Sequence, residues 1–499
     1  MGNAPSDGTT AESENSSSHR RADSEAYPIT ITGVPNEVKE KILSVTSSCK
    51  NETRGVPVFV MLPLDIVTHM NTVHKPERTM ENLKALKSIG VEGVMMDVWW
   101  GIVEKEAPGH YNWTAYRELI EMIRNYGLKV QTVMSFHQCG GNVGDSVNIA
   151  LPKWVVEEMH KDKDLAYTDH WGRRNYEYVS LGSDSLPALR GRTPVQCYAD
   201  FMRSFKENFN DLLGETIAEV HVGMGPAGEL RYPSYPEANG TWKFPGIGAF
   251  QCYDKYMLSS LKARAVAAGN EIWGHPTSNA GHYNDWPEDT QFFKSEGGDW
   301  NSPYGQFFLK WYSDMLLHHG DIILATAVPV FSNTGAKIAA KVSGIHWHYG
   351  TRSHAPELTA GYYNTRFNDG YLPIAHMFFR HGAIFNFTCL EMRDSDNPHN
   401  IKCSPEKLVK QVIVATRKTG VAMGGENALP RFDDAAYRQI IKNSSMKPLC
   451  GFTYLRMKDS LFHGGNWSRF TSFVRKMSEI ASAVDSRDEE YTDAKLNHQ

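Results

Sequence analysis

Short apolar runs alternate with longer amphipathic stretches along the chain from Val56 onward. This alternation is typical of repeated βα units around a parallel sheet, because a strand covered on both faces is apolar throughout and a crossover helix is apolar on one face. Eight apolar runs are present, at residues 57–63, 93–100, 129–137, 217–225, 339–347, 383–392, 421–429 and 451–457. Eight such strands predict an α/β protein with a closed (β/α)8 TIM barrel.

The stretches between these runs have apolar residues at helical spacing. They predict helices at residues 79–89, 115–126, 250–267, 405–416 and 434–441, among others. The alternative arrangement is an open, doubly wound sheet. No Gly-x-Gly-x-x-Gly follows the first run to build the nucleotide crevice of such a sheet, so we favour the closed barrel.

The connections between the predicted strands differ greatly in length. About 80 residues separate the third and fourth strands, and more than 100 residues, rich in Gly, Pro, Trp and Tyr, separate the fourth and fifth. Long connections at the C-terminal face of the strands build the active site of a barrel enzyme. We therefore expect one catalytic barrel over residues 51–484, a largely disordered N-terminal extension over 1–50 and a loose polar tail over 485–499.

Composition and charge exclude several classes of protein. The 499 residues carry 52 Lys and Arg against 57 Asp and Glu, a formal charge of −5 that provides no basic surface for nucleic acid or an anionic membrane. No apolar run approaches the roughly 18 residues of a membrane span. Seven cysteines in so long a chain do not form a secreted disulfide framework. The sequon at Asn386 lies in an apolar run, where a buried strand could not hold a glycan.

Polar residues at the C-terminal ends of the predicted strands indicate the chemistry. Glu229 follows the fourth strand and Glu426 ends the seventh, and each is preceded by glycine. Two carboxyl groups across a cleft are what glycoside hydrolysis needs, because one protonates the leaving oxygen while the other activates water or attacks the sugar. Aromatic rings that could stack on glucose, or simply pack the loops, are Trp99, Trp100, Tyr232, Tyr235 and Trp347.

Strand placement alone leaves the stereochemical outcome open. Retention of the anomeric configuration needs carboxyl groups about 5 to 5.5 Å apart, and inversion needs roughly 6.5 to 9.5 Å so that water fits between them. Either mechanism can use acids on the fourth and seventh strands.

Several longer strings of residues carry a specific resemblance. The sequence is similar to the plant β-amylases from about Gly55 to about Met477, and more like the plastid members through residues 350–356. The matching strings are Val58-Phe-Val-Met-Leu-Pro-Leu64, Asp97-Val-Trp-Trp-Gly101, residues 136–145 (FHQCGGNVGD), residues 225–236 (GPAGELRYPSYP), Phe387-Thr-Cys-Leu-Glu-Met-Arg393 and Gly425-Glu-Asn-Ala-Leu-Pro-Arg431.

This resemblance implies an exo-acting hydrolase that removes maltose from the non-reducing ends of α-1,4-glucans such as starch, with inversion. It implies that Glu229 is the general acid and Glu426 the general base. It also implies a substrate-binding set of Asp97, His137, Asp145, Lys341, His346, Thr388, Asn427, Ala428, Leu429 and Arg456. Residues 140–147, with three glycines, would form a mobile lid that carries Asp145, and residues 386–392 an inner loop in which Thr388 shifts when product binds.

The resemblance implies no cofactor and no metal. His346 and His348, with His137 elsewhere, lack the acid or cysteine ligands of a recognised metal site. The resemblance also implies the plastid stroma, with the cytoplasm as the alternative. The N-terminal segment is too rich in acids to be an intact transit peptide, so a plastid protein would be present here in its mature form. The oligomeric state stays open.

Two alternatives to an active inverting amylase remain. One is a catalytically silent glucan-binding relative, although both glutamates and the lid residues are present. The other is a retaining barrel glycosidase for β-linked glucan, but the Asn-Glu pair usual at its fourth strand is missing. Cys49 and Cys450 precede the first and last strands, which are neighbours where a barrel closes. They form a hypothetical regulatory disulfide, with two free thiols as the alternative.

Overall fold

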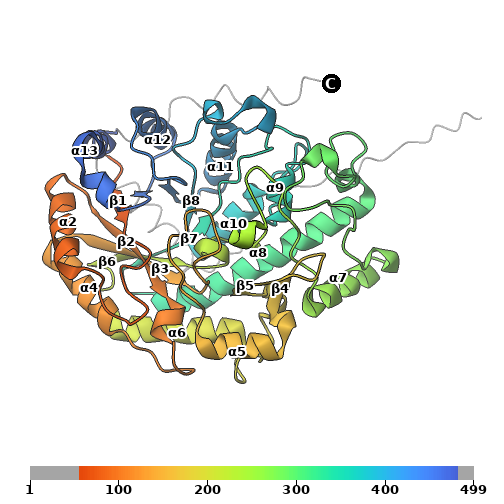
Figure 1. Ribbon diagram of the computed structural model, residues 1–499, viewed down its shortest axis with the longest axis horizontal. Helices are drawn as coiled ribbons and strands as arrows, with labels where there is room; N and C mark the ends of the chain where they lie inside the picture. The colour runs from red at the N-terminus through yellow and green to blue at the C-terminus, as the bar shows by residue number, and fades with distance from the viewer. Residues whose placement is uncertain (1–54, 481–499) are drawn as a thin grey trace, which may run out of the picture.

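The computed structural model describes residues 55–480, and in this range the predicted eight-stranded barrel is confirmed (Figure 1). All eight predicted strands are present and parallel, and β1 pairs with the last strand, β10, to close the barrel. The barrel strands are β1 (Val58–Met61), β2 (Gly93–Trp99), β3 (Lys129–Ser135), β6 (Ile217–Val222), β7 (Lys337–Val342), β8 (Ile384–Phe387), β9 (Met423–Glu426) and β10 (Phe452–Tyr454).

The strands form where the sequence is apolar at successive positions. β1, β2, β8, β9 and β10 are buried at every residue, as expected when helices cover the outside and side chains fill the inside. β2 and β3 pair in continuous parallel register from Gly93 opposite Lys129 to Trp99 opposite Ser135. Met61, Met95 and Val133 pack together as a separate apolar cluster. The barrel interior is therefore a packed core below the site, and not a pore.

Helices surround this barrel (Figure 1). They are α2 (Pro76–Ser88), α3 (Trp100–Val103), α4 (Thr114–Asn125), α5 (Lys153–Lys161), α6 (Pro194–Phe209), α7 (Lys255–Ala267), α8 (Pro303–Phe331), α9 (Ala355–Thr359), α10 (Tyr371–His381), α11 (Pro405–Thr419), α12 (Asp434–Met446) and α13 (Gly464–Ser478). The five helices predicted by range are confirmed, with one correction at a start. α7 begins at Lys255 and not at residue 250, because the Asp254 side chain caps it by accepting the amides of Tyr256 and Met257.

The two long connections hold structure that the apolar pattern did not reveal. The connection after β3 contains an antiparallel hairpin, β4 (Ala166–Thr168) and β5 (Arg174–Val179). The connection after β6 ends in the 29-residue α8, which runs past β7 and packs against α6 and α10 (Figure 1). These long connections therefore contribute scaffold as well as loops.

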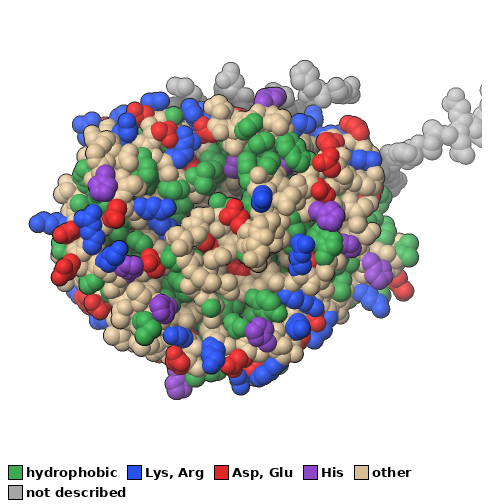
Figure 2. All heavy atoms as spheres, viewed as in Figure 1, with side chains coloured by type: hydrophobic (Ala, Val, Ile, Leu, Met, Phe, Trp, Pro, Cys, Tyr) green, Lys and Arg blue, Asp and Glu red, His purple; other side chains and the backbone are tan. Residues whose placement is uncertain are grey.

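The surface and the chain ends bear on the remaining predictions. Figure 2 shows Lys, Arg, Asp and Glu interspersed over the visible face, without a large area of one sign. Within residues 55–480, every helix is too short or too polar to cross a membrane. The predicted N-terminal extension, the C-terminal tail and Cys49 lie outside the described residues, so those predictions are not tested.

Candidate active site

The two candidate catalytic glutamates meet at one lysine, Lys341 of β7. The Lys341 Nζ atom lies 2.9 Å from Oε1 of Glu426. The backbone of the same lysine pairs with that of Glu229, and the Leu230 amide donates to the Lys341 carbonyl at 2.9 Å. Two acids separated by nearly 200 positions in the sequence therefore lie at the C-terminal end of the same barrel strand.

Glu426 is held by the barrel itself. It is the last residue of β9 and is buried. Asn386 of β8 donates its side-chain amide to Oε1 of Glu426 at 2.7 Å, and Lys341 of β7 supplies the positive charge. The buried Glu426 carboxyl therefore has both an ammonium group and an amide as hydrogen-bond donors. The sequon at Asn386 is confirmed to be buried, and its side chain points at this acid.

Glu229 sits on a tight turn beyond its strand. β6 ends at Val222, and Glu229 follows the short helical turn η4 (Pro226–Gly228). Gly228 has φ +74°, and a Cβ at Gly225 would lie 2.7 Å from the Glu229 carbonyl oxygen, so this turn requires glycine at both positions. The Glu229 carboxyl accepts a bond from Nε of Arg231 at 2.8 Å and another from the Ser343 hydroxyl. Glu229 is only partly buried, so one side of the acid is open to a ligand.

Asp97, His137 and Arg456 come from three different strand ends. Asp97 of β2 accepts a bond from the Ser135 hydroxyl at 2.8 Å. Burial lowers the pKa of His137 to about 4, so its ring is neutral and keeps hydrogen-bonding capacity for a hydroxyl group. Arg456 donates to the Leu62 carbonyl at 2.7 Å.

Thr388 and His346, beyond the ends of β8 and β7, both contact the backbone of Gly344. The Thr388 hydroxyl accepts the Gly344 amide at 2.7 Å, and Nδ1 of His346 lies 3.2 Å from the Gly344 carbonyl. Burial lowers the pKa of His346 to about 4, as for His137. The expected inner loop needs a correction at its start, because Asn386 and Phe387 belong to β8 and the loop begins at Thr388.

The segment after Glu426 is held by an acid that the predicted substrate-binding set did not include. Glu391 is fully buried and accepts the backbone amides of Ala428 and Leu429 at 2.8 to 3.0 Å. The Asn427 side chain donates to the Leu429 and Leu455 carbonyls and accepts the Leu455 amide. Asn427 thus shapes this segment, in which Ala428 is partly exposed and Leu429 is exposed.

The predicted lid closes on its own aspartate. Oδ2 of Asp145 accepts the amides of Gly140, Gly141 and Asn142 at 2.8, 3.0 and 2.9 Å. In this conformation the Asp145 carboxylate is engaged within the lid. Asn142 of the same lid accepts a bond from Arg231 at 2.8 Å, so the lid is tied to the partner of Glu229.

The interpretation of several aromatic residues as sugar platforms is wrong. Trp100 and Tyr232 are 0% exposed and pack among other core rings. Trp99, Tyr235 and Trp347 are also buried, and their polar atoms bond to the backbone. An exposed ring that the sequence interpretation missed is Phe244, which is 42% exposed and has its centroid 6.2 Å from that of His346. Its exposure depends on loop packing, which periodicity does not report.

The cysteines beside the site are buried. Cys139 and Cys389 are free thiols, and burial raises the pKa of each. They are therefore poor thiolates at neutral pH, which agrees with a mechanism that uses no thiol. The hypothesis of a bond between Cys49 and Cys450 stays a prediction, because Cys49 lies outside the described residues.

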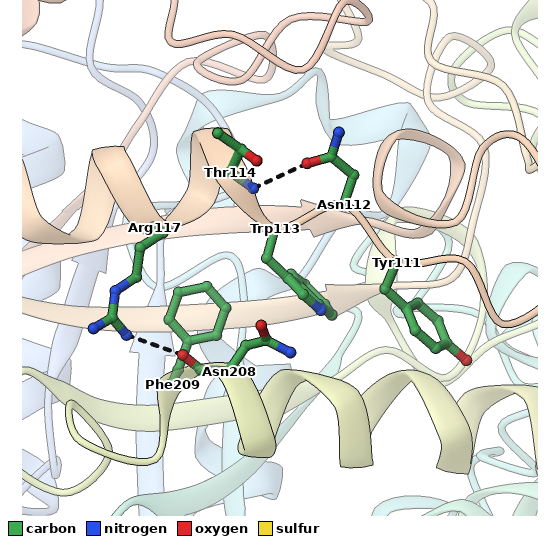
Figure 3. A pocket seen from close by; sticks show the side chains of 7 residues that line it. All are labelled: Tyr111, Asn112, Trp113, Thr114, Arg117, Asn208 and Phe209. Carbon is green, nitrogen blue, oxygen red and sulfur yellow. Dashed lines mark hydrogen bonds between the residues drawn. The ribbon is translucent and has the colours of Figure 1, made fainter.

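A candidate metal site and a surface recess were two further places where a ligand could bind. Residues 55–480 contain no cluster of three or more His, Cys, Asp or Glu that could hold a metal ion. A recess of about 450 Å³ lies outside the barrel, between the start of α4 and the end of α6, and is lined by Trp113, Arg117 and Phe209 among others (Figure 3). None of the predicted site residues lines it.

Comparisons with known proteins agree with this geometry. Residues 59–483 match the model of glycosyl hydrolase family 14. The chain is 66% identical to the chloroplastic beta-amylase 1 of Arabidopsis thaliana over 87% of this chain and 78% of that protein. It is 62% identical to the chloroplastic beta-amylase 1 of Oryza sativa subsp. japonica, over 87% and 83%. The crystal structure of the catalytic domain of a beta-amylase from Paenibacillus polymyxa superposes with a TM-score of 0.71 at 31% identity, covering 86% of this chain and 99% of that one.

Proposed function

The chain belongs to glycosyl hydrolase family 14 and has β-amylase function, and from this premise we propose that Glu229 is its general acid and Glu426 its general base. A β-amylase hydrolyses α-1,4-glucosidic bonds of starch from the non-reducing end and releases β-maltose. The observation that carries the assignment is the position of Lys341, which pairs with Glu229 through its backbone and with Glu426 through its ammonium group. This arrangement supports two acids acting on a single bond.

The reaction divides between the two acids as follows. Glu229 donates its proton to the glycosidic oxygen as the bond to the anomeric carbon breaks. Glu426 removes a proton from a water molecule whose oxygen attacks that carbon from the opposite face, so the configuration inverts. Lys341 and Asn386 keep Glu426 ionised and oriented for this water.

The remaining predicted residues are proposed to bind the glucan. The neutral rings of His137 and His346, the Asp97 carboxylate and the Arg456 guanidinium offer donors and acceptors for sugar hydroxyls around the acids. Thr388 and the segment of Asn427, Ala428 and Leu429 border Glu426. Asp145 would join them when the lid rearranges from its present conformation.

Product analysis with two isosteric variants tests the assignment. We expect wild type to release β-maltose from soluble starch, with the anomer followed by proton NMR immediately after cleavage. Glu229→Gln and Glu426→Gln should each lower kcat by several orders of magnitude, whereas Glu157→Gln, at an exposed ion pair, should not. Substantial activity in either active-site variant would refute its role. Initial release of α-maltose would instead show retention, and products of random length would reject the exo mode.

Two finer assignments are also proposals. Relatives with chloroplastic in their names support a plastid location, which fractionation of intact plastids can test. A reversible Cys49–Cys450 disulfide at the amino-terminal rim of the barrel would change activity from a distance. If so, Cys450→Ser should remove any difference in activity between the oxidised and reduced protein.

A further inference from the structure

A chain of side chains runs from the candidate general acid to a second buried carboxyl group, Glu177 of β5. Nε of Arg231 donates to Oε2 of Glu229 at 2.8 Å, and its Nη2 donates to Oδ1 of Asn142 at 2.8 Å. The Asn142 amide nitrogen then donates to Oε1 of Glu177. The Ala227 backbone amide, in the turn that carries Glu229, is near enough to the Glu177 carboxyl to lower its pKa. Glu177 thus lies near the turn that carries Glu229 and is linked through Asn142 to Arg231, the cation that contacts Glu229.

The charges in this chain do not balance when both acids are ionised. Arg231 is buried, stays protonated and supplies one positive charge to two carboxyl groups. Burial raises the pKa of Glu177 to about 7 although Arg231 and Asn142 both act to lower it, so its ionised form is costly there even with Arg231 nearby. The negative charge of Asp145 in the lid also raises the pKa of Glu177. One cation beside two carboxyl groups therefore leaves a net negative charge in this chain when both acids are ionised.

We propose that Glu177 is a positioning residue for the general acid, which takes the charge of Arg231 when Glu229 carries the proton that it will donate. Arg231 alone would bind the Glu229 carboxylate and keep it ionised, which is the wrong form for an acid catalyst. With Glu177 ionised on the other side, Arg231 is neutralised and Glu229 can hold its proton. This inference rests on the proposed role of Glu229.

Glu177→Gln tests the inference, because it keeps the shape and the acceptor for Asn142 but removes the charge. The alkaline limb of the kcat profile reports the acid that must be protonated in the enzyme–substrate complex. In Glu177→Gln this limb should move to lower pH by about one unit, since a neighbouring charge shifts such an equilibrium by about that much. The maximal kcat on maltoheptaose should stay within about fivefold of wild type and KM within about twofold.

A second variant and a control separate charge from structure. Asn142→Asp places a new negative charge against Arg231 and should move the alkaline limb to higher pH, and this variant remains informative if Glu177→Gln does not fold. Glu157→Gln removes one member of an exposed ion pair with Arg190, away from the lid, and should leave the limb in place. An unchanged alkaline limb in folded Glu177→Gln, or in Asn142→Asp, would overturn the inference.

The same experiment distinguishes this inference from the proposed function. If Glu229→Gln is inactive and all variants still release β-maltose, then an unmoved alkaline limb counts against Glu177 alone. If Glu229→Gln stays active, the assignment of the general acid fails, and the role of Glu177 fails with it.

Discussion

The two candidate catalytic acids are held by different parts of the molecule. Glu426 ends a barrel strand, and its partners Lys341 and Asn386 lie on the two preceding strands of the barrel, β7 and β8. Glu229 lies seven residues beyond the end of β6, and its cationic partner Arg231 is in the same connection and is tied to the lid through Asn142. One acid is thus positioned by strand register and the other by loop packing.

This difference suits the two tasks. A base that activates water needs a fixed charge and a fixed direction, and the register of a closed barrel provides both. An acid must gain and release a proton in each turnover, so partners on loops that can rearrange are compatible with its task. Changes on the Glu426 side should therefore affect mainly the chemical step, while changes on the Glu229 side should affect mainly its pH dependence.

Among the residues that hold the two acids, the largest effect should come from Lys341→Met, which removes the cation that the barrel strands place beside Glu426. Methionine keeps most of the length of the side chain but removes the charge 2.9 Å from Glu426. We expect kcat to fall about 100-fold to 1,000-fold, as for other losses of a preorganised charged group, and the acid limb of the pH profile to move to higher pH. The control is Lys442→Met, which removes one member of the exposed pair with Glu406 and should change kcat less than twofold. A fall smaller than tenfold in Lys341→Met would show that register, and not charge, fixes the base.

A second test concerns the buried Glu391, which fastens the segment after Glu426. Burial raises its pKa from the ordinary 4.5 to about 7 in the folded protein. The sign follows from proton binding: this group stabilises the fold fully below pH 4.5, and its contribution is lost as the pH rises through about 7. A shift of this size corresponds to up to about 3 kcal/mol.

The measurement for Glu391 is urea unfolding of wild type and Glu391→Gln at pH 5 and at pH 8. The free energy of unfolding should fall more between these two values in wild type than in the variant, because glutamine does not titrate. Equal falls in both proteins would contradict the assignment of this titration to Glu391. An exposed acid changed to glutamine, at Glu288, provides the control for a general effect of charge.

Much of this comparison could be predicted from the sequence, and the reason is specific. β2, β8 and β9 are buried along their whole length, so each leaves an unbroken apolar run, and the residue at its end is easily recognised. That is why Asp97 and Glu426 could be named from their strands. Glu229 lies beyond the end of its strand and was recognised by the glycine before it and by the family resemblance. α8 was not among the predicted helices, because apolar residues such as Leu317 and Val328 lie outside its buried stripe, so its sequence lacks a clean amphipathic pattern.

The contacts that could not be predicted lie between residues of the long connections outside the barrel strands. Arg231, Asn142 and Glu177 meet across 35 and 89 positions of separation, and no repeat of apolar residues marks such a meeting. The interpretation of Trp100 and Tyr232 as sugar platforms was wrong for a related reason. The sequence shows an aromatic residue at a strand end or in a connection, but not whether its ring faces the cleft or the core. Burial of single side chains in the connections depends on packing that only the folded structure contains.

The smallest effect should come from Ser343→Ala, which sharpens the loop-held side. The Ser343 hydroxyl donates to the oxygen of Glu229 that Arg231 also contacts, so the variant removes one donor and leaves the cation. One lost hydrogen bond to a charged group corresponds to about 1.5 kcal/mol or less here, and we expect kcat to change threefold to tenfold. Because the hydroxyl stabilises the ionised acid, the alkaline limb of kcat should move to higher pH, opposite to the shift expected for Glu177→Gln. Ser353→Ala, at a buried serine whose hydroxyl has no hydrogen-bond partner within residues 55–480, should leave the profile unchanged. If the limb instead moved to lower pH in Ser343→Ala, the hydroxyl would be accepting a hydrogen bond from the protonated carboxyl of Glu229, and the acid would rest in its protonated form even beside Arg231.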